Sequence, residues 1–223
     1  MPRREAVRRG RAAQVVALAA LAGFGLLFAL VRADRTRELD LGLTIKLQRL
    51  RRPWASWVMA AASWPGFPPQ SRVIPPAIIG TLWLLGFRLE AAGQAAGWGS
   101  ALLSTVVKAG MRRQRPLSPE VRVVVAPLGG TSFPSGHVLT YVGTYGFLAF
   151  LVHSLVRPPA VRLPLTGALA GLVALVGPSR IHQGHHWPTD VLASYLLGLS
   201  YLLGLSALYR RLKADPRLGR RWT

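Results

Sequence analysis

The apolar positions of this chain fall into long blocks that are separated by polar, mostly basic segments. Blocks of this length predict membrane-crossing helices, because a helix needs about 20 mainly apolar residues to span the hydrocarbon core. The block at 73–87 is short for a span and needs its flanking residues. We therefore predict an all-α fold: a single integral membrane domain, residues 1–223, built as a six-helix transmembrane bundle. Its spans are expected at about 15–31, 73–87, 91–107, 136–152, 163–176 and 191–208.

The stretch between the first two predicted spans, residues 32–72, follows a different pattern. The apolar piece from Trp54 to Trp64 is too short to span and is rich in Trp, which favours the membrane interface. Before it, leucines recur at helical spacing among charged residues, which predicts a short amphipathic interfacial helix: Leu39, Leu43, Leu47 and Leu50. Two roles are open for this stretch, a packing collar without chemistry or a part in admitting lipid to a site.

Basic residues at both ends of the chain predict its orientation. Arginines crowd residues 1–13, just before the first span, and basic residues recur after Tyr209. Because cytoplasmic segments are rich in Lys and Arg and the predicted number of spans is even, we expect both termini in the cytoplasm. The connection 153–162 then also lies inside, and we place the protein in the cell inner membrane. A cleaved signal peptide is the competing interpretation of 15–31, but the apolar run is long for one.

Net charge and cysteine content narrow the class of partner. The formal net charge is +20, and there is no Cys. A basic balance can indicate nucleic-acid binding, yet the chain has no basic helix with interleaved aromatic residues, so no nucleic-acid partner is expected. The arginines stand beside apolar blocks instead, where the lipid bilayer with its anionic headgroups and phosphate esters is the natural partner. The absence of Cys excludes disulfides and Cys-ligated metal.

Residues 179–190, SRIHQGHHWPTD, gather His, Arg and Asp between two apolar blocks. Ionisable residues at such a place are costly beside a bilayer and usually mark function. Pro188 suits the first turn of a helix, which would put His186 and Asp190 four residues apart on one face. The Asp carboxylate could then accept one imidazole N–H and leave the other nitrogen free to attack. Taken alone, the stretch is equally consistent with a polar loop that joins two membrane helices.

Two further clusters precede this stretch and complete a pattern. The first is Lys-x6-Arg-Pro, with Lys108 and Arg115-Pro116, and the second is Pro-Ser-Gly-His at 134–137. The third, at 179–190, reads Ser-Arg-x5-His-x3-Asp. In this order, the three motifs resemble the signature of the type 2 phosphatidic acid phosphatase family, whose relatives include soluble acid phosphatases and vanadium haloperoxidases. The six predicted spans favour the membrane lipid phosphatase branch.

The resemblance implies a role for each motif residue. His186 is expected to be the nucleophile, oriented by Asp190, and to form a phosphohistidine. His137 is expected to protonate the leaving group and later to take a proton from water. The phosphate-binding pocket would combine three cations with the turn that opens the fourth span: Lys108, Arg115, Ser135, Gly136 and Arg180.

Four nearby residues fall outside the motif spacing. His182 and His185 are expected to be ordinary polar loop residues, and Arg112 and Arg113 to contact headgroups or solvent. An alternative reading takes several of these as a metal site, with His182, His185, His186 and Asp190 as ligands, although the motif cations would repel a divalent ion. We therefore expect no metal and no cofactor.

The expected position of the motifs indicates the kind of substrate. All three fall at the outer ends of predicted spans, so the active site would lie on the periplasmic or extracellular face. A phosphoryl pocket level with the membrane surface meets lipid headgroups first, and phosphatidic acid, phosphatidylglycerol phosphate and a polyprenyl diphosphate all qualify. A non-catalytic lipid transporter or scaffold that keeps the fold is the alternative function, but the complete set of acid, nucleophile and cations argues against it.

Overall fold

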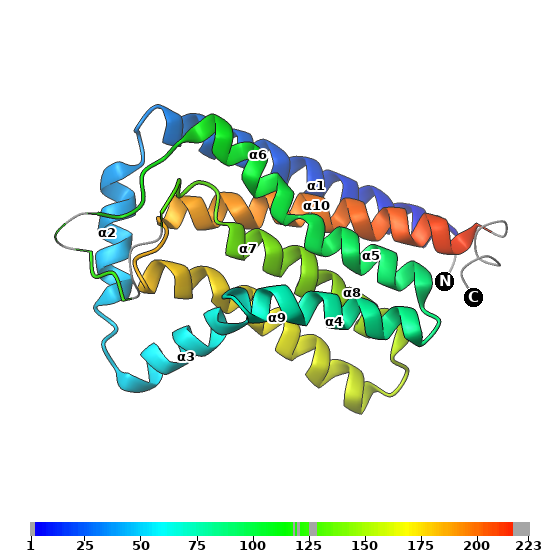
Figure 1. Ribbon diagram of the computed structural model, residues 1–223. Coiled ribbons are helices and arrows are strands. Elements are labelled where there is room, and N and C mark those ends of the chain that lie inside the picture. The colour runs from blue at the N-terminus through cyan, green and yellow to red at the C-terminus, as the bar shows by residue number, and fades with distance from the viewer. Residues whose placement is uncertain (1–2, 118, 120, 125–128, 216–223) are drawn as a thin grey trace.

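The computed structural model describes residues 3–117, 119, 121–124 and 129–215, and within these ranges every regular element is a helix (Figure 1). The predicted all-α fold is thereby confirmed. In chain order the elements are α1 (Arg3–Arg32), α2 (Arg37–Gln48), α3 (Pro53–Ser63), the 3-10 turn η1 (Trp64–Gly66), α4 (Gln70–Leu84), α5 (Arg88–Gly99), α6 (Ala101–Met111), α7 (Gly136–Tyr141), the π-helical turn η2 (Val142–Gly146), α8 (Phe147–Leu155), α9 (Pro159–His182) and α10 (Pro188–Ala214).

Four helical segments of the described chain are long and apolar enough to cross a membrane: 10–32, 136–155, 159–182 and 188–214. They correspond to the first, fourth, fifth and sixth predicted spans. The second prediction falls on α4, which has 15 residues. The third is divided at Ser100 into α5 and α6, of 12 and 11 residues. The count of six spans is therefore not confirmed and stays a prediction.

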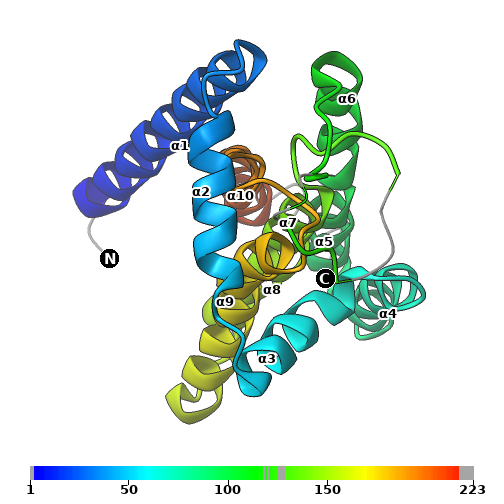
Figure 2. The same ribbon diagram turned by 90° about the vertical axis from the view of Figure 1, so that its left-hand side faces the viewer.

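The helices form an elongated bundle with a crossing layer at one end. α1 packs along α10, α4 against α5, and α8 against α9. The start of α1 and the end of α10 lie at the same end of the bundle, while α2 and α3 run across the opposite end (Figures 1 and 2). The connections that carry the three motifs lie at this second end, beneath α2.

Close helix contacts hold the middle of the bundle together. α5 meets η2 backbone to backbone, since a Cβ atom at Gly97 would stand 2.5 Å from the carbonyl oxygen of Gly143. Only small residues allow such an approach between membrane helices. Below the motif end, apolar side chains of α7, η2, α9 and α10 form a buried cluster: Val138, Tyr141, Val142, Tyr145, Val176 and Val191.

The predicted amphipathic helix is present as α2, and its two faces are unusual. Leu39 and Leu43 are 58% and 43% exposed on the protein surface, whereas Asp40, Thr44 and Gln48 are buried. The buried face of α2 is therefore polar, and its apolar face is left for the surroundings. Because buried polar groups need hydrogen-bond partners, this helix must be bonded to the motif connections beneath it.

Candidate active site

The three motifs, distant in sequence, meet around one cavity of about 390 Å³ at the α2 end of the bundle. Five of the eight predicted site residues line this cavity: Lys108, Arg115, Gly136, His137 and His186. The other three, Ser135, Arg180 and Asp190, are fully buried next to it. The sequence motifs therefore assemble into one site, in which five residues line the cavity and three are buried next to it.

His186 stands in the short connection before α10, and Asp190 in the first turn of that helix. Pro188 opens the helix, as predicted, and the Trp187 backbone N–H donates to Asp190 Oδ2 at 2.9 Å. The same carboxylate oxygen lies 3.6 Å from Nδ1 of His186. This distance suits an ion pair but is too long for a hydrogen bond, so Nδ1 has no hydrogen-bond partner within the described part of the chain. Catalytic hydrogen bonds are often long before substrate binds.

The other imidazole nitrogen of His186 faces the motif cation Arg115. Nη1 of Arg115 donates to the carbonyl oxygen of His185 at 2.7 Å and lies 3.3 Å from Nε2 of His186. A guanidinium can only donate, so this contact requires a lone pair on Nε2 and leaves the imidazole proton on Nδ1, facing Asp190. The arrangement favours the tautomer in which Nε2 carries the lone pair and faces the Arg115 guanidinium.

The surroundings of His186 keep it neutral. Burial lowers the pKa of His186 well below its ordinary value, and the charges of Arg115, Arg180 and Lys108 lower it further. Each effect disfavours the imidazolium form. An unprotonated imidazole at neutral pH is the form that can attack phosphorus.

His137 occupies the first turn of α7 and is covered by the segment that follows α3. Its ring meets the ring of Phe67 edge-on at 5.1 Å. A Cβ atom at Gly66 would stand 2.3 Å from Cδ2 of His137, so a glycine is required there. Within the described chain, Nε2 of His137 is buried without a hydrogen-bond partner. The ring is thus packed in place while one nitrogen remains available to a ligand.

Arg180, near the end of α9, is held by contacts with several neighbouring side chains. Its guanidinium bonds Gln183 Oε1 at 2.9 Å and Ser63 Oγ at 3.4 Å, contacts Nδ1 of His185, and lies over the Phe67 ring. His185 lies in the loop between α9 and α10, as predicted, but its side chain is buried and contacts Arg180. Sequence spacing excluded His185 from the motif but could not detect this supporting contact.

The turn at Ser135 offers fewer backbone donors to an anion than predicted. α7 begins at Gly136, as expected, but the Ser135 backbone N–H already donates to Ser194 Oγ at 2.7 Å. The Ser135 hydroxyl, in contrast, is buried without a partner among the described residues. Lys108 is near the same turn, because a Cβ atom at Gly136 would stand 3.9 Å from its Nζ. The groups of this turn that are suited to contact an anion are therefore the Ser135 hydroxyl and the adjacent Lys108 ammonium.

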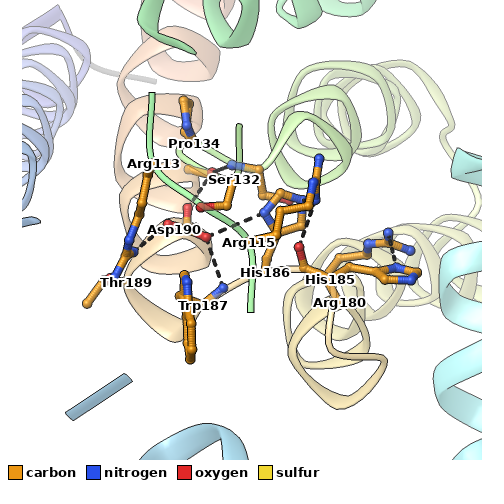
Figure 3. Close-up of polar contacts among 12 residues, drawn as sticks. Arg113, Arg115, Ser132, Pro134, Arg180, His185, His186, Trp187, Thr189 and Asp190 are labelled. Carbon is orange, nitrogen blue, oxygen red and sulfur yellow. Dashed lines mark hydrogen bonds and ion pairs between the residues drawn. The ribbon is translucent and has the colours of Figure 1, made fainter. Parts of the chain in front are cut away.

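The prediction that Arg113 contacts headgroups or solvent is wrong. Its guanidinium is largely buried and forms ion pairs with Asp40 of α2, at 2.6 Å, and with Asp190, at 2.5 Å. Figure 3 shows Arg113 on one side of Asp190 and His186 on the other. Sequence reasoning missed Asp40, yet a signal existed, because Asp40, Thr44 and Gln48 recur every four residues and so share one helix face.

Gln48 connects the same face of α2 to two motif connections. Its side-chain amide donates to the carbonyl oxygens of Arg122, at 2.7 Å, and His182, at 3.0 Å, and accepts from the Arg122 backbone N–H at 2.9 Å. The predicted collar is therefore bonded to the active-site end, and the prediction that His182 is an ordinary polar loop residue is corrected: it ends α9 and is buried.

The alternative metal site finds no support in this geometry. Within the described ranges, no three His, Asp or Glu side chains come together in an arrangement that could hold a metal ion. Metal independence itself stays a prediction.

Comparison with known proteins agrees with the assembled motifs. The family model of the PAP2 superfamily matches residues 94–214. Phosphatidylglycerophosphatase B of Bacillus subtilis (strain 168) is 28% identical over 191 residues, which cover 79% of this chain and 86% of that protein.

Two solved structures share the fold. The crystal structure of the first transmembrane PAP2 type phosphatidylglycerolphosphate phosphatase from Bacillus subtilis superimposes with a TM-score of 0.77, at 24% identity, over 89% of this chain and 98% of that one. Aquifex aeolicus LpxE superimposes with a TM-score of 0.61, at 22% identity, over 76% and 95% of the two chains. Since the family model covers more than half of the chain, and its apolar helices have the length of membrane spans, this protein belongs to the PAP2 superfamily and has the character of a membrane protein.

Proposed function

We propose that this protein is a membrane lipid phosphatase that hydrolyses a phosphate monoester or diphosphate headgroup through a phosphohistidine intermediate, without a metal. One observation carries the proposal. Two histidines, His137 and His186, and two motif cations, Lys108 and Arg115, line the same cavity. A nucleophile, an acid and the charges that neutralise phosphate are thus available to one phosphoryl group.

In the first step, Nε2 of His186 forms a bond to phosphorus while the bond from phosphorus to the leaving oxygen breaks. His137, protonated when the dianionic substrate is bound, donates its proton to that oxygen. In the second step, water gives a proton to His137 and attacks phosphorus, and the bond to His186 breaks. Lys108 and Arg115 neutralise the non-bridging oxygens throughout, which is the main electrostatic requirement of phosphoryl transfer.

The remaining predicted residues complete the pocket. Ser135, with its unbonded hydroxyl, is suited to donate to one phosphoryl oxygen. Arg180 lies behind the wall with its Nε unbonded among the described residues, and its charge reaches the phosphoryl site from there. Asp190 stabilises the positive charge that His186 acquires when phosphorylated.

The lining of the cavity suits a lipid better than a small soluble ester. Besides the motif residues, Thr140 of α7 and Thr144 of η2 line it, together with Trp98 and Tyr145. Such a mixed polar and aromatic lining suits the part of a lipid next to its headgroup. The Bacillus relative is named for phosphatidylglycerophosphate, which supports that lipid as the first candidate, before phosphatidic acid and a polyprenyl diphosphate.

We further propose six membrane spans in the cell inner membrane, both termini in the cytoplasm and the active site on the outer face. Arg51, between α2 and α3, and Arg157, between α8 and α9, are exposed, and these two connections lie at opposite ends of the bundle (Figure 1). Cys introduced at residue 51 should react with an impermeant thiol reagent from outside, and Cys at residue 157 only after the cytoplasmic side is opened. The reverse pattern would overturn this orientation.

Phosphate release by the purified protein, tested on the three lipids with EDTA present, examines the function itself. We expect hydrolysis of at least one lipid, inhibition by vanadate and no loss of rate on chelation. Loss of activity with EDTA that zinc or magnesium restores would support the metal alternative. Binding of these lipids without hydrolysis would support the transporter or scaffold.

A further inference from the structure

Asp40, the first residue of the buried polar face of α2, contacts the start of α10. Its carboxylate is fully buried. It accepts hydrogen bonds from the Thr189 backbone N–H at 2.9 Å and from the Thr189 hydroxyl at 2.8 Å. An ionised carboxylate in such a place requires partners of this kind. Asp40 therefore closes the first turn of α10 directly beside Asp190.

Arg113 joins the two carboxylates. Nη2 of Arg113 lies 2.6 Å from Asp40 Oδ2, and Nη1 lies 2.5 Å from Asp190 Oδ1. The second oxygen of Asp190 faces Nδ1 of His186 at 3.6 Å. The three charged side chains form a row of alternating charge that runs from α2 to the neutral imidazole of His186, and Figure 3 shows Arg113, Asp190 and His186.

One guanidinium is thus shared by two carboxylates. Without Asp40, Arg113 would be left with Asp190 as its single anionic contact in the described part of the chain. Arg113 would then neutralise the charge of Asp190 more completely and draw the Asp190 carboxylate away from His186. We propose that Asp40 is a positioning residue for phosphoryl transfer: acting through Arg113, it sets the orientation and net charge with which Asp190 faces His186. This inference rests on the proposed function, because it takes His186 as the nucleophile.

Other charged groups face the same row from the elements around it. Arg115, Lys108 and Arg180 act on His186 from the cavity side. Asp34 and Arg37 line a second cavity beside Arg113. None of these forms an ion pair with Arg113 or Asp190 within the described residues, so Asp40→Asn alters the charge of this row alone. Asn also keeps an oxygen that can accept from Thr189.

Asp40→Asn therefore tests the proposal, with Thr44→Val as its matched control. Thr44 is buried on the same face of α2, and among the described residues its hydroxyl bonds only the Asp40 carbonyl oxygen, at 2.7 Å. Rapid quench with labelled lipid phosphate measures the rate constant of phosphoenzyme formation, and stoichiometric binding of vanadate, a phosphate mimic, counts competent sites. We expect the rate constant of Asp40→Asn to fall on the order of 10- to 100-fold, with KM and the number of sites close to wild type. Thr44→Val should keep the wild-type rate constant.

Arg113→Gln supplies the second part of the test. If Asp40 acts through Arg113, adding Asp40→Asn to Arg113→Gln should lower the rate constant less than about twofold further, because residues in one chain of contacts are not additive. The proposal is overturned by an unchanged rate constant in Asp40→Asn, by an equal loss in Thr44→Val, or by full additivity in the double variant. Wild-type protein that forms no labelled histidine would refute the proposed function instead, so the two failures can be told apart.

Discussion

The two sides of His186 differ in how completely their polar groups are bonded. On the cavity side, Nε2 of His137 and the hydroxyl of Ser135 are buried without hydrogen-bond partners in the described structure. On the α2 side, Asp40 and Arg113 are joined to each other and to the start of α10 by short contacts. Buried polar atoms without partners are rare and require an explanation, and a phosphate ester supplies one. We therefore propose that the unbonded side binds substrate and that the bonded side holds the nucleophile.

This contrast also orders the expected effects of mutation. In the proposed mechanism, groups on the cavity side act on phosphorus or on the leaving oxygen, so their removal should alter chemistry directly. Groups on the α2 side act through Asp190 or through the motif connections, and their removal should have smaller effects on rate. Asp190 and His186 connect the two sides, and their 3.6 Å separation is longer than a hydrogen bond.

The largest effect is expected for His186→Ala. Without the nucleophile, no covalent phosphate should form, and hydrolysis should fall by about 10⁴-fold or more, as in other enzymes that lose a nucleophile. Rapid-quench experiments measure the rate of hydrolysis, and acid-labile phosphate on the protein measures the covalent intermediate. His185→Ala is the control, since its side chain contacts Arg180 and does not line the cavity, and it should still become phosphorylated. If His185→Ala were inactive and His186→Ala were still phosphorylated, the nucleophile would be His185 and not His186.

His137→Ala should follow, with a loss of about 10²–10⁴-fold that is typical for a missing general acid. The loss should shrink when the leaving group needs no proton, so we expect a smaller ratio of wild-type to variant rates on an activated aryl phosphate than on a lipid monoester. Steady-state rates on both substrates give the comparison. Equal losses on the two substrates would show that His137 does not protonate the leaving group.

Arg113→Gln tests the residue that joins Asp40 to Asp190 on the α2 side. We expect a loss in kcat of about 10- to 100-fold with little change in KM, because Arg113 contacts Asp190 and has no place on the cavity wall. Arg112→Gln is the matched control, because the Arg112 side chain is exposed. This variant should behave as wild type. Similar kinetics for the two variants would remove the distinction between these adjacent arginines.

Gln48→Ala should have the smallest effect on rate and a measurable effect on stability. It removes the hydrogen bonds from α2 to Arg122 and His182, and leaving their carbonyl groups unpaired should lower the free energy of unfolding by about 1–3 kcal/mol. Thermal unfolding in detergent and kcat of the folded protein measure the two quantities. A loss of kcat as large as that of Arg113→Gln at unchanged stability would mean that all of α2 acts on the chemistry.

The cavity side could be predicted from the sequence because its residues carry fixed spacing within three motifs. The helical class and the four helices long enough to span a membrane could equally be predicted, since a long apolar block in a bilayer must form a helix or a closed barrel. The break at Ser100 was not predictable, because the Gly- and Ala-rich block gives no local stop and tertiary contacts decide where it divides.

The α2 side could not be predicted in the same way. Asp40 and Arg113 are far apart in sequence, and Arg113 is one of 28 Lys and Arg residues in this basic chain. Arg112 and Arg113 look alike until the fold places one of them between two carboxylates. The covering of His137 by Gly66 and Phe67 likewise depends on a tertiary contact that leaves no periodic signal.

The central claim is that His186 is the covalent nucleophile of a lipid phosphatase, and trapping of the intermediate tests it most directly. Wild-type protein is mixed with lipid phosphate labelled in the phosphoryl group, quenched in base within milliseconds, digested and mapped by mass spectrometry. The account predicts one base-stable, acid-labile phosphate on the peptide that contains His186, bonded at Nε2 and absent from His186→Ala. Rapid hydrolysis of the lipid with no phosphate on any histidine, or with phosphate on His137 instead, would contradict it.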